Sequence, residues 1–220
     1  MWQDLYADLK DKDFTVVAVA LDTAEAVKQW VEAAGVEYPA LIDAEHRLAD
    51  LYNFVNVPEA AWIDEAGRIV RPPETAGAYE AFRYRDRTSG ETPADEMAKR
   101  DQARDTYYTA VRDWAEHGAE SRFVMSPEDA RAHMGKPTPE QAEAHAFFRL
   151  GAYLKARGRD AEAARHMARA SDLHPASWAM WRQTAERNEM GFAAGEAFWE
   201  RVDALGDGRY YPPPPMPGMP

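Results

Sequence analysis

The chain has 220 residues, of which 45% are hydrophobic and 11% aromatic, so it can build a packed core in one large or two small domains. Its formal net charge of −12 argues against binding to DNA or RNA, because affinity for phosphate backbones comes from Lys and Arg. Because the sequence contains no cysteine, it offers no disulfide, thiolate metal site or cysteine nucleophile. No run of about eighteen apolar residues predicts a transmembrane segment. With no leader pattern at its start, the chain as written is expected to be cytoplasmic, and a segment before Met1 would allow export or anchoring.

The first part of the chain alternates between helical and strand patterns. Apolar residues at positions 2, 5, 6 and 9 share one helical face and predict a helix over residues 1–9, with no cap ahead of it. Residues 14–20 are nearly all apolar, which predicts a strand buried on both faces. Asp22 or Thr23 then caps a helix that ends at Gly35. We expect the apolar side of this helix to be buried: Val27, Trp30, Val31 and Ala34.

A second strand, a second helix and a hairpin follow. Residues 38–42 form a short apolar run, and Asp43 is placed to cap a helix that continues to Tyr52. Residues 60–63 and 68–70 flank a turn containing Gly67, which predicts a β-hairpin. Residues 71–91 are polar and proline-containing, so they predict a linker or long loop.

Repeated capping signals indicate that residues 92–205 are helical. Three segments combine a hydroxyl residue, a proline at the first helical position and an acidic or amide side chain; they begin at Thr92, Ser126 and Thr138. Apolar residues at helical spacing indicate core packing rather than a cofactor site: Tyr107, Tyr108, Val111 and Trp114. Residues 206–220 are proline-rich and predict an extended tail. A disordered end is favoured over a ligand for an aromatic groove.

Residues 57–70 read Val-Pro-Glu-Ala-Ala-Trp-Ile-Asp-Glu-Ala-Gly-Arg-Ile-Val, and they follow the segments 14–22 and 38–43 in the order and spacing of a known family. In these stretches the chain resembles the thioredoxin-like fold, and within it the TlpA/ResA-like thiol–disulfide oxidoreductases. The resemblance implies an α/β thioredoxin-like domain over residues 1–80, followed by a linker over residues 81–91. It also implies a cis bond between Val57 and Pro58, with both residues beside the active site. From the residues alone, a trans proline at the start of a strand fits equally well.

The chain departs from this family at the reactive motif. The Cys-x-x-Cys pair and the strand before it are absent, and without a thiolate the chain has no nucleophile for disulfide exchange. We therefore predict no catalytic residue in this chain, and whether it is an enzyme stays open. One hypothesis is a redox protein whose reactive motif lies upstream of Met1, with a protein disulfide as substrate. A selenocysteine in that motif, encoded by UGA and read as a stop, would account for a chain that begins mid-helix. The alternative is a redox-inactive binding module that holds a protein partner.

The helical part carries a second resemblance, over residues 142–175. Positions characteristic of a tetratricopeptide repeat are matched by Phe147, Leu150, Gly151, Ala163, Ala170 and Pro175. Trp181 stands one period, about 34 residues, after Phe147. The resemblance implies an antiparallel pair of helices, at about 142–157 and 160–172, which approach closely at Gly151 and Ala163. A plain helical hairpin that covers the neighbouring domain is an equal alternative.

The histidines give no pattern typical of a metal site. Glu162 and His166 are four residues apart and predict an ordinary surface contact. Neither a His-Glu-x-x-His motif nor a glycine-rich phosphate loop is present. The sequence therefore predicts no metal and no cofactor.

Overall fold

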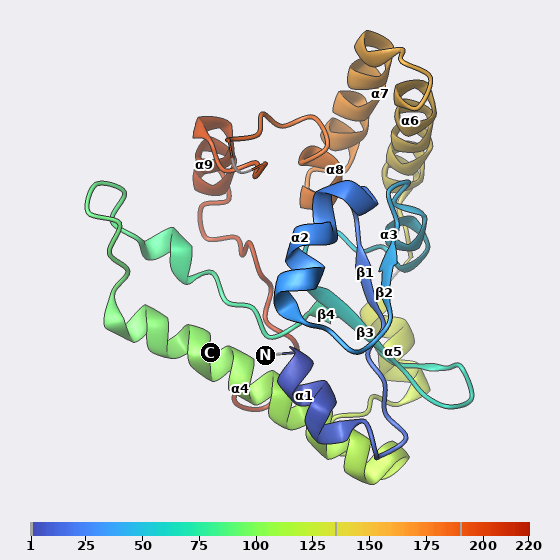
Figure 1. Cartoon of the computed structure of the whole chain (residues 1–220), viewed down its shortest axis with the longest axis vertical. Coiled ribbons are helices and arrows are strands. Elements are labelled where there is room, and N and C mark those ends of the chain that lie inside the picture. Colours follow the sequence, from blue (N-terminus) through green and yellow to red (C-terminus); the bar gives the residue numbers. More distant parts are fainter. Residues whose placement is uncertain (1, 135, 190) are drawn as a thin grey trace.

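A computed structural model describes residues 2–134, 136–189 and 191–220. It has a mixed α/β N-terminal region with two small sheets, followed by a mostly helical part (Figure 1). The elements of the α/β region are α1 (Trp2–Leu9), β1 (Ala18–Ala20), α2 (Ala24–Ala34), β2 (Ala40–Ile42), α3 (Arg47–Tyr52), β3 (Glu59–Ile63) and β4 (Ile69–Thr75). Those of the helical part are η1 (Ala81–Tyr84), α4 (Ala94–His117), η2 (Gly118–Glu120), α5 (Pro127–Met134), α6 (Pro139–Lys155), α7 (Asp160–Leu173), α8 (Trp178–Trp181) and α9 (Glu196–Asp203).

The strands form two separate ribbons. β1 pairs in parallel with β2, with Ala18 opposite Ala40. β3 pairs antiparallel with β4, with Glu59 opposite Thr75, which confirms the predicted hairpin. Among the described residues no ladder joins the two ribbons, so β1 and β3 each have one edge without a strand neighbour.

The first strand and the helix after it are more exposed than the sequence predicts. β1 has three residues rather than seven, its side chains are only half-buried, and Val17 just before it is 53% exposed. No residue of α2 is buried, and Trp30 is 53% exposed. The predictions of a fully buried strand and a buried helix face are therefore wrong. An apolar pattern records which surface could be buried, whereas burial requires a second element to pack against it.

Several predicted caps are present. The Thr23 hydroxyl accepts the backbone N–H of Ala26 and begins α2. The Asp43 carboxylate accepts the N–H of Arg47 at 2.8 Å and that of Leu48 at 2.7 Å, so it caps α3 although that helix starts later than predicted. Carboxylates in this position satisfy amides that have no partner within the helix.

The cap predictions for the helical part are right in two cases of three. The Ser126 hydroxyl accepts the N–H of Asp129 at the start of α5. Thr138 and Gln141 form a complete capping box on α6. The prediction for Thr92 is wrong, because α4 begins without any side-chain cap. Packing of its long central portion against the hairpin makes a cap less important to this helix.

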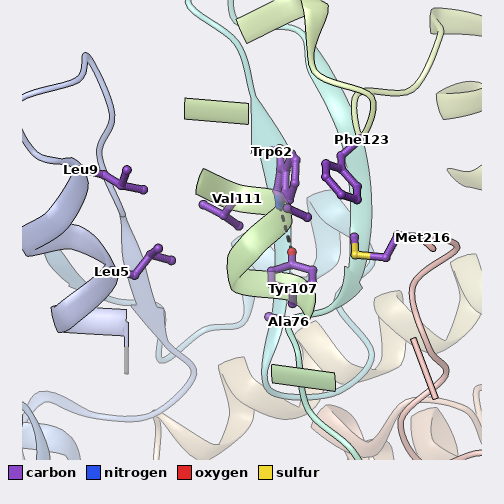
Figure 2. Close-up of a cluster of buried hydrophobic side chains, with 9 residues drawn as sticks. Leu5, Leu9, Trp62, Ala76, Tyr107, Val111, Phe123 and Met216 are labelled. Carbon is purple, nitrogen blue, oxygen red and sulfur yellow. Dashed lines mark hydrogen bonds between the residues drawn. The ribbon is translucent and has the colours of Figure 1, made fainter. Parts of the chain in front are cut away.

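The main core lies where the β3–β4 hairpin packs on α4. The indole N–H of Trp62 donates to the hydroxyl of Tyr107 at 2.9 Å, and these side chains are only 3% and 0% exposed (Figure 2). Figure 2 also shows the other side chains of this core: Leu5, Leu9, Ala76, Val111, Phe123 and Met216. The expected core role of Tyr107 and Val111 is confirmed. The hydrogen bond matters because a buried indole N–H without an acceptor would be costly.

Residues 71–80 are not the polar linker that the sequence predicts. β4 continues through both prolines to Thr75, and Arg71 is buried within it. Two N–H groups of the Arg71 guanidinium donate to the Glu74 carboxylate at 2.7 Å each, and a third donates to the carbonyl of Phe123 at 2.6 Å. The opposite charges of Arg71 and Glu74 thus balance each other, and their polar atoms are hydrogen-bonded. Both conditions are needed for charged side chains to be buried without a large cost.

The proline-rich tail contains no helix or strand, and it is not the disordered end that the sequence favours. Tyr210 and Met216 are buried, and Met216 belongs to the main core formed by the hairpin and α4. The carbonyl of Gly218 accepts the amide of Gln102 and the hydroxyl of Thr106, both on α4. Figure 1 shows the chain returning to α4 at its end. Because Tyr210 and Met216 pack into hydrophobic clusters of the rest of the chain, the tail is ordered despite its prolines.

Helices α6 and α7 form the predicted antiparallel pair (Figure 1). A Cβ atom on Gly151 would lie 2.6 Å from Cγ of Met167 and 3.1 Å from the carbonyl oxygen of Ala163. The first distance is shorter than real Cβ contacts show and the second is tighter than most of them, so glycine allows the two helices to approach this closely. The close approach at Gly151 and Ala163 is confirmed.

We predict that Gly151→Leu lowers the free energy of unfolding by about 3 kcal/mol, because its side chain has no space between α6 and α7. Urea unfolding followed by circular dichroism measures this change. The matched control is Ala164→Leu, next to Ala163 but exposed on α7, which should change stability by about 0.5 kcal/mol or less. Equal effects from the two substitutions would show that the helices are not in close contact at Gly151.

Candidate functional site

The candidate site is the loop that leads into β3, where the sequence places Val57 and Pro58. The peptide bond between these residues is cis, and both are exposed, Val57 to 45%. The carbonyl of Pro58 accepts the N–H of Ala76, which ties the loop to the end of β4. The implied position of Val57 and Pro58 beside the family's active site stays a prediction.

Asn56 is the buried polar centre of the loop, and it is 3% exposed. Its side-chain amide donates to the carbonyl of Tyr210 at 2.9 Å. Its side-chain oxygen accepts the N–H of Val57 at 2.9 Å and a guanidinium N–H of Arg182 at 3.0 Å. Arg182 also donates to the Tyr210 hydroxyl. The loop conformation is therefore fixed by residues from the far end of the chain.

The C-terminal tail lies directly against the exposed side of this loop. The Tyr211 hydroxyl donates to the carbonyl of Val57 at 3.0 Å. The tail is held in turn by Glu80, a carboxylate only 1% exposed, which accepts the backbone N–H groups of Tyr210 at 2.6 Å and Tyr211 at 3.3 Å. Arg209 pairs with the same carboxylate at 3.1 Å. One buried acid thus anchors the segment that contacts the backbone of Val57.

Glu59, the first residue of β3, is the titratable group of the loop. Burial raises its pKa to about 7, although the carboxylate accepts the N–H of Val55 at 2.9 Å. Glu59 lines a cavity of about 730 Å³, together with Glu74, His145 and Arg149. A carboxyl group that titrates near neutrality can exchange a proton at physiological pH, which an ordinary surface glutamate does not do.

The sequence pointed to Val57 and Pro58 but missed Asn56, Glu59 and Tyr211. The available signals were an acid at the first position of an otherwise apolar strand, and a pair of tyrosines just before a proline run. Neither signal reveals its partner, because the loop and the tail are more than a hundred residues apart.

Within the described ranges, no three His, Cys, Asp or Glu side chains come together as metal ligands. Glu162 pairs with Arg159 at 2.7 Å rather than with His166, whose ring stacks on Phe147. None of the described helices is long and apolar enough to cross a membrane. Since the chain has no cysteine, it contains no thiol for disulfide exchange.

Comparison with known proteins finds relatives for the α/β region. Residues 1–71 match the AhpC/TSA family. Over 68 residues the chain is 35% identical to the thiol-disulfide oxidoreductase ResA of Oceanobacillus iheyensis, a stretch that covers 30% of this chain and 35% of that protein. The chain therefore spans about a third of the length of this curated relative. No solved structure matches the chain significantly. The α/β region is thus similar to redoxins, the motif that gives redoxins their activity is absent from this chain, and the helical part has no assigned relative.

We predict that Glu59→Gln stabilises the chain at pH 8 by about 1–3 kcal/mol and has little effect at pH 4. At pH 4 the carboxyl is protonated in both the folded and the unfolded chain. As the pH rises from 4.5, the ordinary pKa, to about 7, only the unfolded chain ionises, so stability is lost over that interval. Glutamine keeps an oxygen that accepts the Val55 N–H. Because glutamine does not ionise, the variant should not lose stability between pH 4.5 and about 7.

Urea unfolding at several pH values between 4 and 8 measures the effect. The control is Glu45→Gln, an exposed position before α3, which should not change the pH profile. If Glu59→Gln changed the free energy of unfolding by the same amount at every pH, the result would contradict a buried carboxyl group with a raised pKa.

Proposed function

We propose that residues 1–80 form a thioredoxin-like domain of the TlpA/ResA-like kind, which serves thiol– or selenol–disulfide exchange on a protein disulfide. The reactive residue would be supplied by a segment outside residues 1–220, upstream of Met1. The observation that carries this proposal is the division of the sheet into two ribbons, β1–β2 and β3–β4, among the described residues.

The open edges of the two ribbons favour one intervening strand. The N–H of Ala18 donates to the carbonyl of Pro39, and the carbonyl of Ala20 accepts the N–H of Asp43, so the backbone of Val19 between them faces away from β2. The end of β1, at Val19 and Ala20, lines the same cavity as Val57, just before β3. A strand between β1 and β3 would satisfy backbone groups on both edges. In the related oxidoreductases, the reactive motif follows such a strand.

The alternative function is a redox-inactive binding module whose tetratricopeptide-like hairpin holds a protein partner. It is supported by the lack of any thiol and by the α6–α7 pair, which presents exposed apolar side chains at Leu150 (42% exposed) and Tyr153 (52% exposed). Exposed apolar side chains of this kind suit a protein–protein contact better than a small polar ligand.

The decisive experiment combines the coding DNA with an activity measurement. The DNA 5′ of the Met1 codon is read in frame, and the product of any extended reading frame is compared with the 220-residue chain in the reduction of insulin disulfides by dithiothreitol. We predict that the 220-residue chain leaves the rate at the uncatalysed level, because it has no thiolate. The extended product should accelerate the reaction, and serine at its reactive position should abolish that gain.

The outcomes separate the two functions. An in-frame cysteine codon, or a TGA codon read as selenocysteine, preceded by codons for an apolar strand, supports the redox protein. An upstream region that is out of frame or without coding potential would overturn it and favour the binding module.

A further inference from the structure

We propose that the cavity between the end of β1 and the C-terminal segment binds a small organic anion with an aromatic body. The cavity has a volume of about 580 Å³. Its walls come from β1 and the following residues, the loop before β3, and parts of residues 179–189 and 191–211. This site is proposed for the 220-residue chain and goes beyond the redox or partner-binding role proposed above, although a strand inserted between β1 and β3 would change the wall formed by Val19, Ala20 and Val57.

Two arginines supply the cationic part of the cavity. Arg182 uses one guanidinium nitrogen for Asn56 and Tyr210, and among the described residues its other two nitrogens donate to no further group. Arg187 pairs with Asp22 at 3.3 Å through one nitrogen and is 41% exposed. Two arginines against one carboxylate give this cavity a positive balance, although the whole chain carries a net charge of −12. Guanidinium groups bind carboxylates and similar anions through pairs of N–H donors.

His46 adds a polar group that has no partner in the described structure. Its side chain lines the cavity, the residue is 5% exposed, and its Nε2 atom makes no hydrogen bond. Burial lowers the pKa of His46, so the ring is neutral at physiological pH, and it already makes a hydrogen bond to the backbone of Leu21. Because Nε2 itself has almost no exposed surface, the His46 ring forms part of the neutral wall of the cavity and adds no charge that competes with the arginines.

Aromatic side chains supply the apolar part. Phe192, Phe198 and Tyr211 line the cavity, and Phe192 is still 46% exposed, with Trp30 of α2 5.8 Å from it between ring centroids. Aromatic rings prefer a planar apolar partner in stacked or edge-on contact. The cavity therefore fits an aromatic carboxylate or sulfonate better than an inorganic anion, which would leave these rings exposed, or a cation, which the arginines would repel.

The experiment is a fluorescence titration of the full chain with 8-anilinonaphthalene-1-sulfonate, an aromatic sulfonate, at low ionic strength. Competition by benzoate is compared with competition by benzyl alcohol, which has the same ring without the charge. We expect saturable binding of the dye that benzoate displaces and benzyl alcohol does not. We also expect the affinity to fall as salt is added.

Two substitutions with opposite expected effects test the electrostatic part. Arg187→Gln should weaken dye binding about fivefold or more, and Asp22→Asn should strengthen it about two- to fivefold, because each changes one charge at the cavity wall. The control is Arg159→Gln, whose arginine pairs with Glu162 on α7 outside the cavity lining. Circular dichroism melting verifies that each variant is folded.

The results distinguish this site from other apolar surfaces of the chain. Opposite shifts for Arg187→Gln and Asp22→Asn, with no shift for the control, support the proposal. Equal dye affinity in all four proteins, or equal competition by benzoate and benzyl alcohol, would overturn it. All four proteins are 220-residue chains, so failure of this proposal leaves the upstream reactive motif to the coding-DNA experiment.

Discussion

Backbone hydrogen bonding is the constraint on which the rest of this structure depends. Within the described residues, β1 and β3 are each paired on one side only, so the α/β region contains two ribbons in place of one continuous sheet. The short β1, the exposed Val17 and the unburied face of α2 follow from this division, because a two-stranded ribbon offers little surface for a helix to cover. A strand inserted between the ribbons would complete both the hydrogen bonding and the core.

The helical part compensates for the divided sheet. Helix α4 covers the hairpin through the buried contact between Trp62 and Tyr107, and the tail adds Met216 to the same core. The tail also reaches the loop before β3, where the Tyr211 hydroxyl bonds to Val57. The α/β region and the helical part therefore share one core and one candidate site. The proposed boundary at residue 80 coincides with Glu80, whose buried carboxylate anchors the C-terminal tail.

The sequence predicted features whose cause is local. Thr138 and Gln141 lie within one turn, the hairpin has its turn glycine between two apolar strands, and Gly151 has its small partner in the next helix. The burial of the tail and the titration of Glu59 could not be predicted in this way. Both depend on neighbours far along the chain, and a pattern of apolar and polar residues does not encode which distant surface is available.

Amide hydrogen exchange tests the divided sheet most directly. The N–H of Ala18 donates to β2, whereas that of Val19 faces the open edge. In the 220-residue chain we therefore predict that the Val19 amide exchanges at least about tenfold faster than the Ala18 amide. If a longer product adds a strand at this edge, as proposed, the two amides should be protected to a similar degree in it. Equal protection of Val19 and Ala18 in the 220-residue chain itself would show that the edge of β1 is already paired, and would contradict a sheet divided into two ribbons.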